Sequence, residues 1–555
     1  MINGNPTMLI NGEAVPENAY ITYFIKKARY DDFSAAGYKL FSVPLYFATR
    51  GITEINEIPP FDDGIFENEV PDFNVIDRAI RQILEACPDA YIFPRVNMNL
   101  PERWERENPD ELCDYGNIDM NRRRPCYSSD KWAEETKRLL GLFIDHIENS
   151  DYRDHICAYQ LAKGNAEEWF GLDQRGSIGK RSRERFEEYK KKHSIEGSEE
   201  EYYRFLSEIA AERLIEFCEF AKEKTGHRLL VGSFYGYTFE RQDRESNHHA
   251  LKLVLESDSV DFLCSPVSYM NLRECGKDAP CMMPLESLKR HGKLYFMEND
   301  ARTHLTAPLF DVPHFHNPHY RPRERWHTVE TLKMYYSRAL IKAHALWWFD
   351  MGGGWYHYPL YMDMMRDFRR ITVESKEKDM SGVSEVAVLI DEGSFAALDR
   401  DARVKTTKPV CYDFRTTLGL MGAPYDSYLA SDYELIRDDY KAFIILVPRE
   451  TELLASVTRD AMARSHTLVI TPEGADITTD ELRKFLREAG VHLYSDKDAV
   501  IYVNKSYLFL HTSSIGCANI NMPSGKKLRQ ILGDRIDVTR DALPDKTSYL
   551  FEIVD

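Results

Sequence analysis

Eight short apolar runs, spread along the chain up to residue 351, constrain its fold more than any other feature of the sequence. Amphipathic stretches with helical spacing lie between them, for example at 75–88, 131–150 and 201–226. The runs are continuously apolar rather than alternating, which is typical of strands buried on both faces. Eight strands that alternate with helices predict a (β/α)8 barrel. The runs occupy residues 19–25, 38–47, 90–101, 155–162, 227–236, 260–269, 293–300 and 343–351.

The pattern restarts after the charged stretch 371–382. Apolar runs at 385–390, 442–448 and 467–472 alternate with helical stretches, which predicts a smaller, doubly wound, flavodoxin-like α/β domain. This part has no glycine-rich phosphate loop, so we do not expect it to bind a nucleotide. From about residue 499 the sequence favours β-hairpins. We therefore expect three domains: a barrel at 1–375, the α/β domain at 383–497 and a small β region at 498–555.

Charge and composition exclude several classes of protein. A net charge of −18 argues against binding a nucleic-acid backbone, which requires clustered basic residues. The one basic cluster, residues 179–193, is interleaved with acids and is typical of a solvated helix surface. There is no charged leader followed by an apolar core, and no apolar stretch long enough to span a membrane. We therefore expect a cytoplasmic protein that binds neither nucleic acid nor membrane.

Neither the cysteines nor the histidines predict a metal or a cofactor. The ten cysteines contain no CxxC pair, which favours reduced thiols over a disulfide framework. Cys113, Cys126, Cys275 and Cys281 have the wrong spacing for a zinc ribbon. The histidine-rich segment 314–327 is interrupted by prolines and lacks regular ligand spacing, so we interpret it as a loop.

Polar residues that follow the predicted strands are the candidates for chemistry, because barrel active sites lie at the carboxyl ends of the strands. Glu298 ends the buried run of strand seven, where an unpaired charge would be costly. Glu167 and Glu168 follow strand four, although an adjacent pair of glutamates is also typical of a solvated patch. Two opposed carboxyl groups with aromatic walls suit the hydrolysis of a glycosidic bond. Candidate sugar-binding residues are Arg95, Asn97, Asn165, Trp169, Tyr235, Tyr269, Arg302, Asp350 and Trp355.

Several of these candidates also have a purely structural interpretation. Trp348 is as consistent with barrel core as with a pocket wall, whereas Trp355, after three glycines, favours a pocket wall. Tyr235, beside Gly236, is also consistent with packing. Asp300 and Arg302 are interpreted first as structural support for Glu298.

Four stretches together resemble the clan A retaining glycoside hydrolases, and within them the family 42 β-galactosidases with their trimerisation domain. They are YIFPRVNMNLPERW (91–104), YQLAKGNAEEWF (159–170), KLYFMENDARTH (293–304) and WWFDMGGGWY (347–356). By this resemblance Glu298 is the nucleophile, and Trp169 aligns Glu168 with the acid/base. Glu167 then stands where the family has an asparagine that holds the sugar 2-hydroxyl. Either Asn165 supplies that contact, or Glu167 is itself the acid.

The resemblance implies a retaining exo-β-glycosidase that cleaves terminal sugars from small oligosaccharides by double displacement. A β-galactosidase or a β-mannosidase is implied, without a cofactor, in a homotrimer. Arg95 and Tyr235 or Tyr269 would orient the nucleophile and the sugar. The matching cysteine cluster for the zinc that family members often carry is not evident. The alternative is a non-catalytic carbohydrate-binding or sensor protein on a degenerate barrel; Cys411 as a nucleophile is disfavoured because no nucleophile elbow surrounds it.

Overall fold

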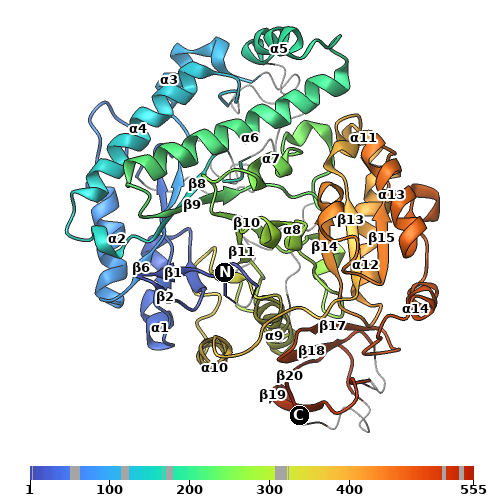
Figure 1. Cartoon of the computed structure of the whole chain (residues 1–555). Coiled ribbons are helices and arrows are strands. Elements are labelled where there is room, and N and C mark those ends of the chain that lie inside the picture. Colours follow the sequence, from blue (N-terminus) through green and yellow to red (C-terminus); the bar gives the residue numbers. More distant parts are fainter. Residues whose placement is uncertain are drawn as a thin grey trace. The chain divides into compact units, whose positions relative to one another are not determined.

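A computed structural model defines the fold (Figure 1). It describes residues 1–2, 4–49, 63–113, 124–164, 167–169, 179–306, 322, 324–514, 520–534, 536 and 543–555. The chain forms two compact units. One comprises residues 19–264 and 395–401, and the other comprises residues 1–18, 265–394 and 402–555.

The unit of residues 19–264 is built on parallel strands that correspond to the first six apolar runs. Two of those runs each form two short strand segments, and the hydrogen bonds from Phe93 N to the Phe41 carbonyl and from Arg95 N to the Val43 carbonyl carry the ladder across both breaks. Six strands of the barrel are therefore accounted for. They are β3 (Asn18–Ile21), β4 and β5 (Leu40–Phe41, Pro44–Tyr46), β6 and β7 (Tyr91–Ile92, Arg95–Asn97), β8 (Ala158–Ala162), β9 (Leu230–Phe234) and β10 (Phe262–Pro266).

Helices follow these strands as predicted. Those of this unit are α1 (Tyr30–Ala35), α2 (Asn74–Ala86), α3 (Glu102–Glu107), α4 (Asp130–Glu148), α5 (Lys180–His193), α6 (Glu199–Lys224) and α7 (Leu251–Leu255). Helix α6 begins with a capping box between Ser198 and Glu201, which satisfies two of its free backbone N–H groups. Helices α4 and α6 lie side by side, and α6 also packs on β9 (Figure 1).

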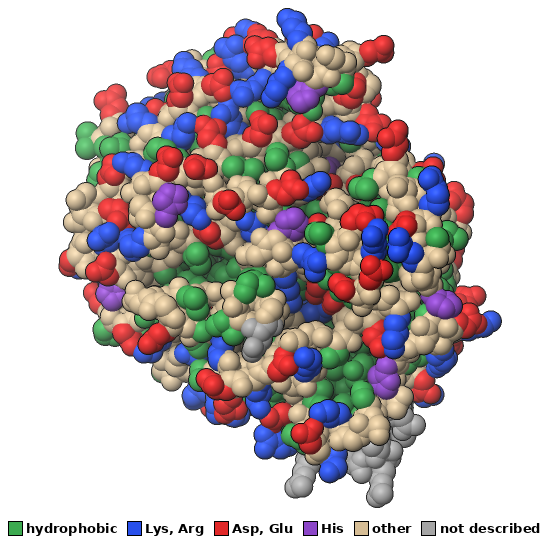
Figure 2. All heavy atoms as spheres, in the orientation of Figure 1, with side chains coloured by type: hydrophobic (Ala, Val, Ile, Leu, Met, Phe, Trp, Pro, Cys, Tyr) green, Lys and Arg blue, Asp and Glu red, His purple; other side chains and the backbone are tan. Residues whose placement is uncertain are grey.

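Helix α5 contains the basic cluster seen in the sequence. Along it, Arg181 pairs with Glu184 and Lys190 with Glu187, each three residues apart. Figure 2 shows acidic and basic side chains interspersed over the region of α5. The cluster is therefore a mixed, solvated helix surface, as predicted.

The other unit supplies the last two barrel strands, β11 (Leu294–Asn299) and β12 (Ala345–Phe349). They are parallel, with Glu298 directly opposite Trp347. The helices around them are α8 (Leu285–Arg290), α9 (Arg325–Ile341) and α10 (Pro359–Ser375). Each of the eight predicted strands is thus present in its predicted place along the chain. The predicted (β/α)8 barrel is confirmed.

A smaller α/β sheet follows within the same unit. Its strands β13 (Val386–Ile390), β14 (Asp426–Leu429), β15 (Ala442–Leu446) and β16 (His466–Ile470) are all parallel, in the order β14-β13-β15-β16. The sequence did not predict β14, whose four residues are too few to give a clear apolar run. The helices are α11 (Arg400–Lys405), α12 (Arg415–Gly419), α13 (Glu452–Arg464) and α14 (Thr479–Glu488).

The C-terminal part forms the predicted β region, and a short hairpin lies near the N-terminus. Four antiparallel strands are ordered β17-β18-β20-β19, and two short strands pair as β1 and β2. Their bounds are β17 (Ala499–Val503), β18 (Tyr507–Thr512), β19 (Lys527–Leu532), β20 (Ser548–Val554), β1 (Leu9–Ile10) and β2 (Glu13–Ala14). None of the helices in the described ranges has the length and apolar character needed to cross a bilayer.

Candidate active site

Glu167, just after β8, is held by a buried ion pair. Its Oε2 lies 2.7 Å from Nη1 of Arg95, and the two side chains are 0% and 1% exposed. The Nε of Arg95 donates to Oε1 of Gln160 at 3.0 Å, and the guanidinium lies 4.9 Å from the ring centre of Phe234. Burial, followed by the negative charge of Glu167, raises the pKa of Tyr46 well above its usual value. The strand-four segment therefore contains a fixed, compensated carboxylate.

The backbone at Glu167 is strained. Its φ is +71°, in the left-handed region that a residue with a Cβ enters only at a cost of about 1–3 kcal/mol. Two consecutive side chains on an extended strand point to opposite faces, but a left-handed residue breaks that rule. The orientation of Glu167 and Glu168 is thus set by a turn in the chain and by the Arg95 contact, and not by strand alternation.

Glu168 is buried but less enclosed than its neighbour, with 9% of its surface exposed against 0% for Glu167. Oε2 of Glu167 is committed to Nη1 of Arg95. A general acid must carry a proton and approach the leaving oxygen, and an oxygen fixed on a guanidinium is poorly placed to do either. The Arg95 contact therefore counts against Glu167 as the acid.

Trp169 packs into the protein core. Its indole is 0% exposed, and Nε1 donates to the Ala210 carbonyl of α6 at 2.9 Å. The rings of Tyr127, Trp132 and Phe217 surround it at centroid distances of 5.8, 6.3 and 5.5 Å. The indole is thus fully enclosed by the core, so this structure gives Trp169 a packing role where the sequence analysis had expected it to bind sugar.

Asn97 and Asn99 shape the end of strand three. Oδ1 of Asn97 accepts from the backbone N–H of Asn99, at 3.1 Å. The Asn99 side chain then exchanges two hydrogen bonds of 2.9 Å with the N–H and the carbonyl of Gly164. Gly164 is thus fixed to the end of strand three. The neighbouring Asn165 lies outside the described residues, so its predicted role remains a prediction.

Tyr235 follows β9 and is fully buried. Its ring lies 6.2 Å from that of His248, edge to face, and Tyr237 lies 6.5 Å from the same imidazole. Burial, followed by the charge of His249, lowers the pKa of His248 well below its usual value, so the ring is neutral at ordinary pH. Strand five thus ends in a buried aromatic cluster, and the packing interpretation of Tyr235 fits this placement.

Lys163, the first residue after β8, is a buried cation next to this segment. Its Nζ lies 4.1 Å from the ring centre of Tyr127 and 4.9 Å from that of Trp132, and it donates to the Pro125 carbonyl. Burial lowers its pKa to about 8. The aromatic rings and one carbonyl therefore compensate the lost hydration only in part.

Glu298, the predicted nucleophile, lies at the end of β11 and is 6% exposed. Its Oε2 accepts a hydrogen bond from Nε1 of Trp347 at 3.1 Å. Trp347 is its direct partner in the parallel register of β11 and β12, so the two side chains lie on the same face of the sheet. Trp348 points the other way and stacks on Phe368 of α10 at 5.7 Å, which identifies it as barrel core.

Asp300 is shared by two buried arginines. Its Oδ1 lies 2.7 Å from Nη2 of Arg273, and its Oδ2 lies 3.5 Å from Nη1 of Arg302. Burial lowers the pKa of Arg302 to about 10, and Asp300 offsets this only in part while Arg273 adds to it. Arg302 also lies over the ring of Trp355 at 4.9 Å. Asp300 and Arg302 thus belong to a buried charged cluster two to four residues beyond Glu298, and their predicted support of Glu298 stays a prediction.

Asp350 organises the glycine-rich loop after β12. Its two carboxylate oxygens accept backbone hydrogen bonds from Gly354 at 2.7 Å and from Trp355 at 2.8 Å. The Trp355 carbonyl accepts from Oγ1 of Thr303, and Tyr356 donates to the Asn299 carbonyl at 3.2 Å. Both carboxylate oxygens are engaged by the loop, which gives Asp350 a structural role. Trp355 itself is 2% exposed, against Arg302.

The loop after β10 is tied to the smaller α/β sheet. Arg415, at the start of α12, donates to Oγ of Ser268 at 2.5 Å, and Tyr412 donates to the carbonyl of Tyr269. The ring of Tyr269 stacks under the guanidinium of Arg273 at 4.2 Å. A continuous set of contacts thus runs from α12 to Arg273 and on to Asp300.

The structure brings the predicted residues together in two groups. Arg95, Asn97, Glu167, Glu168, Trp169 and Tyr235 lie in one unit, and Tyr269, Glu298, Arg302, Asp350 and Trp355 lie in the other. Sequence reasoning missed Arg273, Trp347 and Arg415. Strand register could have indicated Trp347, whereas nothing local marks the two arginines. Most of the histidine-rich segment lies outside the described residues, and within the described ranges no three His, Cys, Asp or Glu side chains are grouped to hold a metal.

The amino-acid sequence matches no protein-family model and no curated protein, but the fold has clear relatives. A family 42 β-galactosidase from G. stearothermophilus matches with a TM-score of 0.61, at 10% identity, over 94% of this chain and 95% of its own. The β-galactosidase from Rahnella sp. R3 gives 0.60 at 10% identity over 99% of both chains. A family 42 exo-carrageenase from Bacteroides ovatus gives 0.58 at 12% identity, over 99% of this chain and 84% of its own. The fold is therefore that of the family 42 β-galactosidases of clan A.

Proposed function

We propose that this protein is a retaining exo-β-glycosidase, with Glu298 as nucleophile and Glu168 as acid/base. The observation that carries the proposal is Glu298 itself. It is a buried carboxylate at the end of the seventh strand, and its Oε2 accepts a hydrogen bond from the indole N–H of Trp347. A barrel of this fold builds its active site from the carboxyl ends of its strands and the loops that follow; Glu298 lies at the end of β11 and Glu168 follows β8.

The reaction follows from these roles. The ionised Glu298 attacks the anomeric carbon and displaces the leaving oxygen, which takes a proton from Glu168, giving a covalent glycosyl-enzyme. Glu168 then removes a proton from water, which attacks the same carbon and releases the sugar with retained configuration. This mechanism requires the two carboxyl groups to lie about 5–5.5 Å apart. The indole N–H of Trp347 would orient Glu298 for attack.

The substrate class rests on the neighbours in fold. Two of them are β-galactosidases and one is an exo-carrageenase, so we propose a terminal β-galactoside as substrate, with β-mannoside as the competing sugar. Glu167 takes the place of the family's asparagine, and its buried pairing with Arg95 leaves little capacity to bind a sugar hydroxyl. We further propose that the protein acts inside the cell on imported oligosaccharides and forms a trimer through residues 383–497. A monomeric mass in light scattering would contradict the trimer.

The test is covalent trapping. A 2-deoxy-2-fluoro β-galactoside with an activated leaving group should add the mass of one glycosyl group to the wild-type protein, on the peptide that contains Glu298. Glu298→Gln, which keeps the size of the side chain, should not be labelled and should lose at least about a thousandfold in kcat. Aryl β-galactosides, β-mannosides and sulfated β-galactosides compared in one panel would identify the sugar.

The outcomes separate this proposal from its alternative. A non-catalytic carbohydrate-binding protein would give no label and no turnover on any sugar in the panel, yet would bind sugars equally well as wild type and as Glu298→Gln. Labelling of a residue other than Glu298 would contradict the assignment of the nucleophile and leave the glycosidase activity intact.

A further inference from the structure

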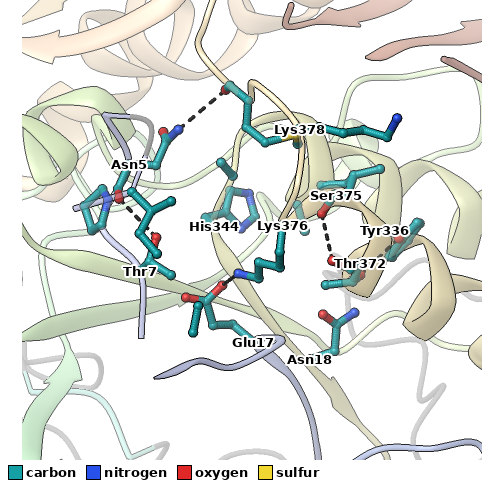
Figure 3. Close-up of a pocket in the computed structure, with 17 residues that line it drawn as sticks. Asn5, Thr7, Glu17, Asn18, Tyr336, His344, Thr372, Ser375, Lys376 and Lys378 are labelled. Carbon is teal, nitrogen blue, oxygen red and sulfur yellow. Dashed lines mark hydrogen bonds and ion pairs between the residues drawn. The ribbon is translucent and has the colours of Figure 1, made fainter. Parts of the chain in front are cut away.

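A partly open cavity of about 80 Å³, lined by polar and apolar side chains, lies at the amino ends of barrel strands β3 and β12, where strand one begins with Asn18 and strand eight follows His344. Figure 3 shows Asn5 and Thr7 on one side of it and Ser375 and Lys376, from the end of α10 and just beyond, on another. None of the proposed catalytic residues lines this cavity, and all of its lining residues belong to one unit. It is therefore a separate site.

The charges around the cavity cancel. Lys376 pairs with Oε2 of Glu17 at 2.8 Å, and Oε1 of Glu17 accepts the backbone N–H of Met8 at 2.6 Å. Lys378 pairs with Glu552. Burial lowers the pKa of His344 to about 3, so its ring is neutral. A lining without net charge attracts neither an anion nor a cation, so electrostatics favour an uncharged ligand.

Most polar groups of the lining are already engaged by the protein. Thr7 donates to the Asn5 carbonyl at 3.1 Å, Ser375 donates to the Thr372 carbonyl at 2.8 Å, and Asn5 donates to the Met380 carbonyl at 3.5 Å. The wall also contains the aliphatic side chains of Pro6 and Leu340. The lining thus combines fixed dipoles with apolar surface.

Asn18 is different. Its side chain is 6% exposed, faces the cavity in Figure 3, and makes no hydrogen bond to any described residue. A buried amide offers two donors and an acceptor, and leaving them unmet costs free energy. The amide of Asn18 is accessible from the cavity, so a ligand there that both donates and accepts can bind to it.

We propose that this cavity binds a small uncharged polyol through the amide of Asn18. A hydroxyl group both donates and accepts, so one hydroxyl can meet the amide while the carbon chain lies on Leu340 and Pro6. The volume admits several water molecules or an organic molecule of a few heavy atoms, which sets the size of the ligand. This inference does not rest on the proposed glycosidase activity.

The proposal is tested by titrating the full chain with erythritol, with binding measured by calorimetry and by ligand-detected NMR. We expect saturable one-to-one binding that weakens at least about tenfold in Asn18→Ala, which removes the amide. Ala14→Leu, which places bulk in the lining, should abolish it without touching Asn18. Asn149→Ala, at the exposed C-cap of α4, is the matched control and should bind like wild type. Thermal melts without ligand show that each variant is folded.

Acetate and methylammonium serve as charged probes and should not compete with erythritol. Equal binding in all variants would mean an adventitious additive only, and no saturable binding would mean a cavity that holds water; either overturns the proposal. Competition by acetate would identify an anion site and also overturn it. Loss of binding in Glu298→Gln, with Asn18→Ala unaffected, would place the polyol in the active site and refute the assignment.

Discussion

The segments at the ends of strands four and seven both hold a buried carboxylate, but with different backbone geometry. Each contains two carboxylates, and in each one carboxylate is ion-paired with a buried arginine: Glu167 with Arg95, and Asp300 with Arg273. In strand seven the paired residue is two positions from Glu298, so an extended chain puts both on one side. In strand four the pair is adjacent, and the backbone turns into the left-handed region at Glu167. In the mechanism that we propose, the carboxylate paired with arginine supports each segment and its neighbour reacts.

The largest expected effect comes from removing each of the two adjacent glutamates in turn. We expect Glu168→Ala to lower kcat by about 10²–10⁴-fold, since general acid–base catalysis contributes that much. Azide should restore turnover in this variant and give a glycosyl azide of retained configuration. Glu167→Ala should not respond to azide, because its carboxylate is bound to Arg95. Rates of both variants on an aryl glycoside, with and without azide, decide the matter. Azide rescue of Glu167→Ala alone would reverse the assignment.

The second test compares the two arginines by unfolding in urea. Removing one partner of a buried ion pair costs about 3–5 kcal/mol, because the other charge stays buried. Arg95→Met should therefore cost this much. Arg273→Met should cost less, since Arg302 lies 3.5 Å from Asp300 and remains as a partner.

The matched control is the double variant Arg95→Met/Glu167→Gln, which removes both charges. It should recover a large part of the stability lost in Arg95→Met alone. If the two single arginine variants lose equal stability, Arg302 does not compensate Asp300, and the two segments are supported in the same way.

The sequence was sufficient for the barrel because each strand is a continuous apolar run, and apolarity over five or more residues is a strong local signal. It also predicted the place of Glu298 at the end of a buried strand, whereas the role of Glu298 as nucleophile stays a prediction. Trp169 shows the limit. An aromatic residue beside a glutamate suggests a sugar platform, but whether its faces are free depends on Trp132 and Phe217, which come from distant helices.

The supporting residues were beyond sequence reasoning for a related reason. Arg273 ends a short 3-10 helix whose local sequence carries no signal of its role, and only the fold places it 2.7 Å from Asp300. The positive φ of Glu167 could not be anticipated, because glycine and asparagine are the residues expected there. Long-range ion pairs and strained turns leave no local pattern.

A smaller effect is expected when the hydrogen bond to Glu298 at the end of strand seven is removed. Trp347→Phe removes the indole N–H that Oε2 of Glu298 accepts at 3.1 Å, while keeping an aromatic ring in the core. A hydrogen bond to a charged group contributes about 1.5–3 kcal/mol, so we expect kcat to fall about tenfold or somewhat more with little change in KM. Trp348→Phe is the control, because Trp348 packs on Phe368. It should reduce stability without reducing kcat, and an equal fall in kcat for both variants would show that the Trp347 hydrogen bond is unimportant.

The smallest expected effect concerns Lys163, beside strand four. Burial lowers its pKa to about 8, below that of an unfolded lysine, which corresponds to a cost of about 3 kcal/mol at neutral pH. The lost contacts with Tyr127, Trp132 and the Pro125 carbonyl offset about 2 kcal/mol of this. Lys163→Met should therefore raise the free energy of unfolding at pH 7 by about 1 kcal/mol.

Because the folded state binds fewer protons than the unfolded state between pH 8 and about 10.4, the wild type gains stability as pH rises through that window. The advantage of Lys163→Met should shrink accordingly in urea unfolding at pH 9.5, and an advantage that is independent of pH would show that Lys163 is not a strained cation.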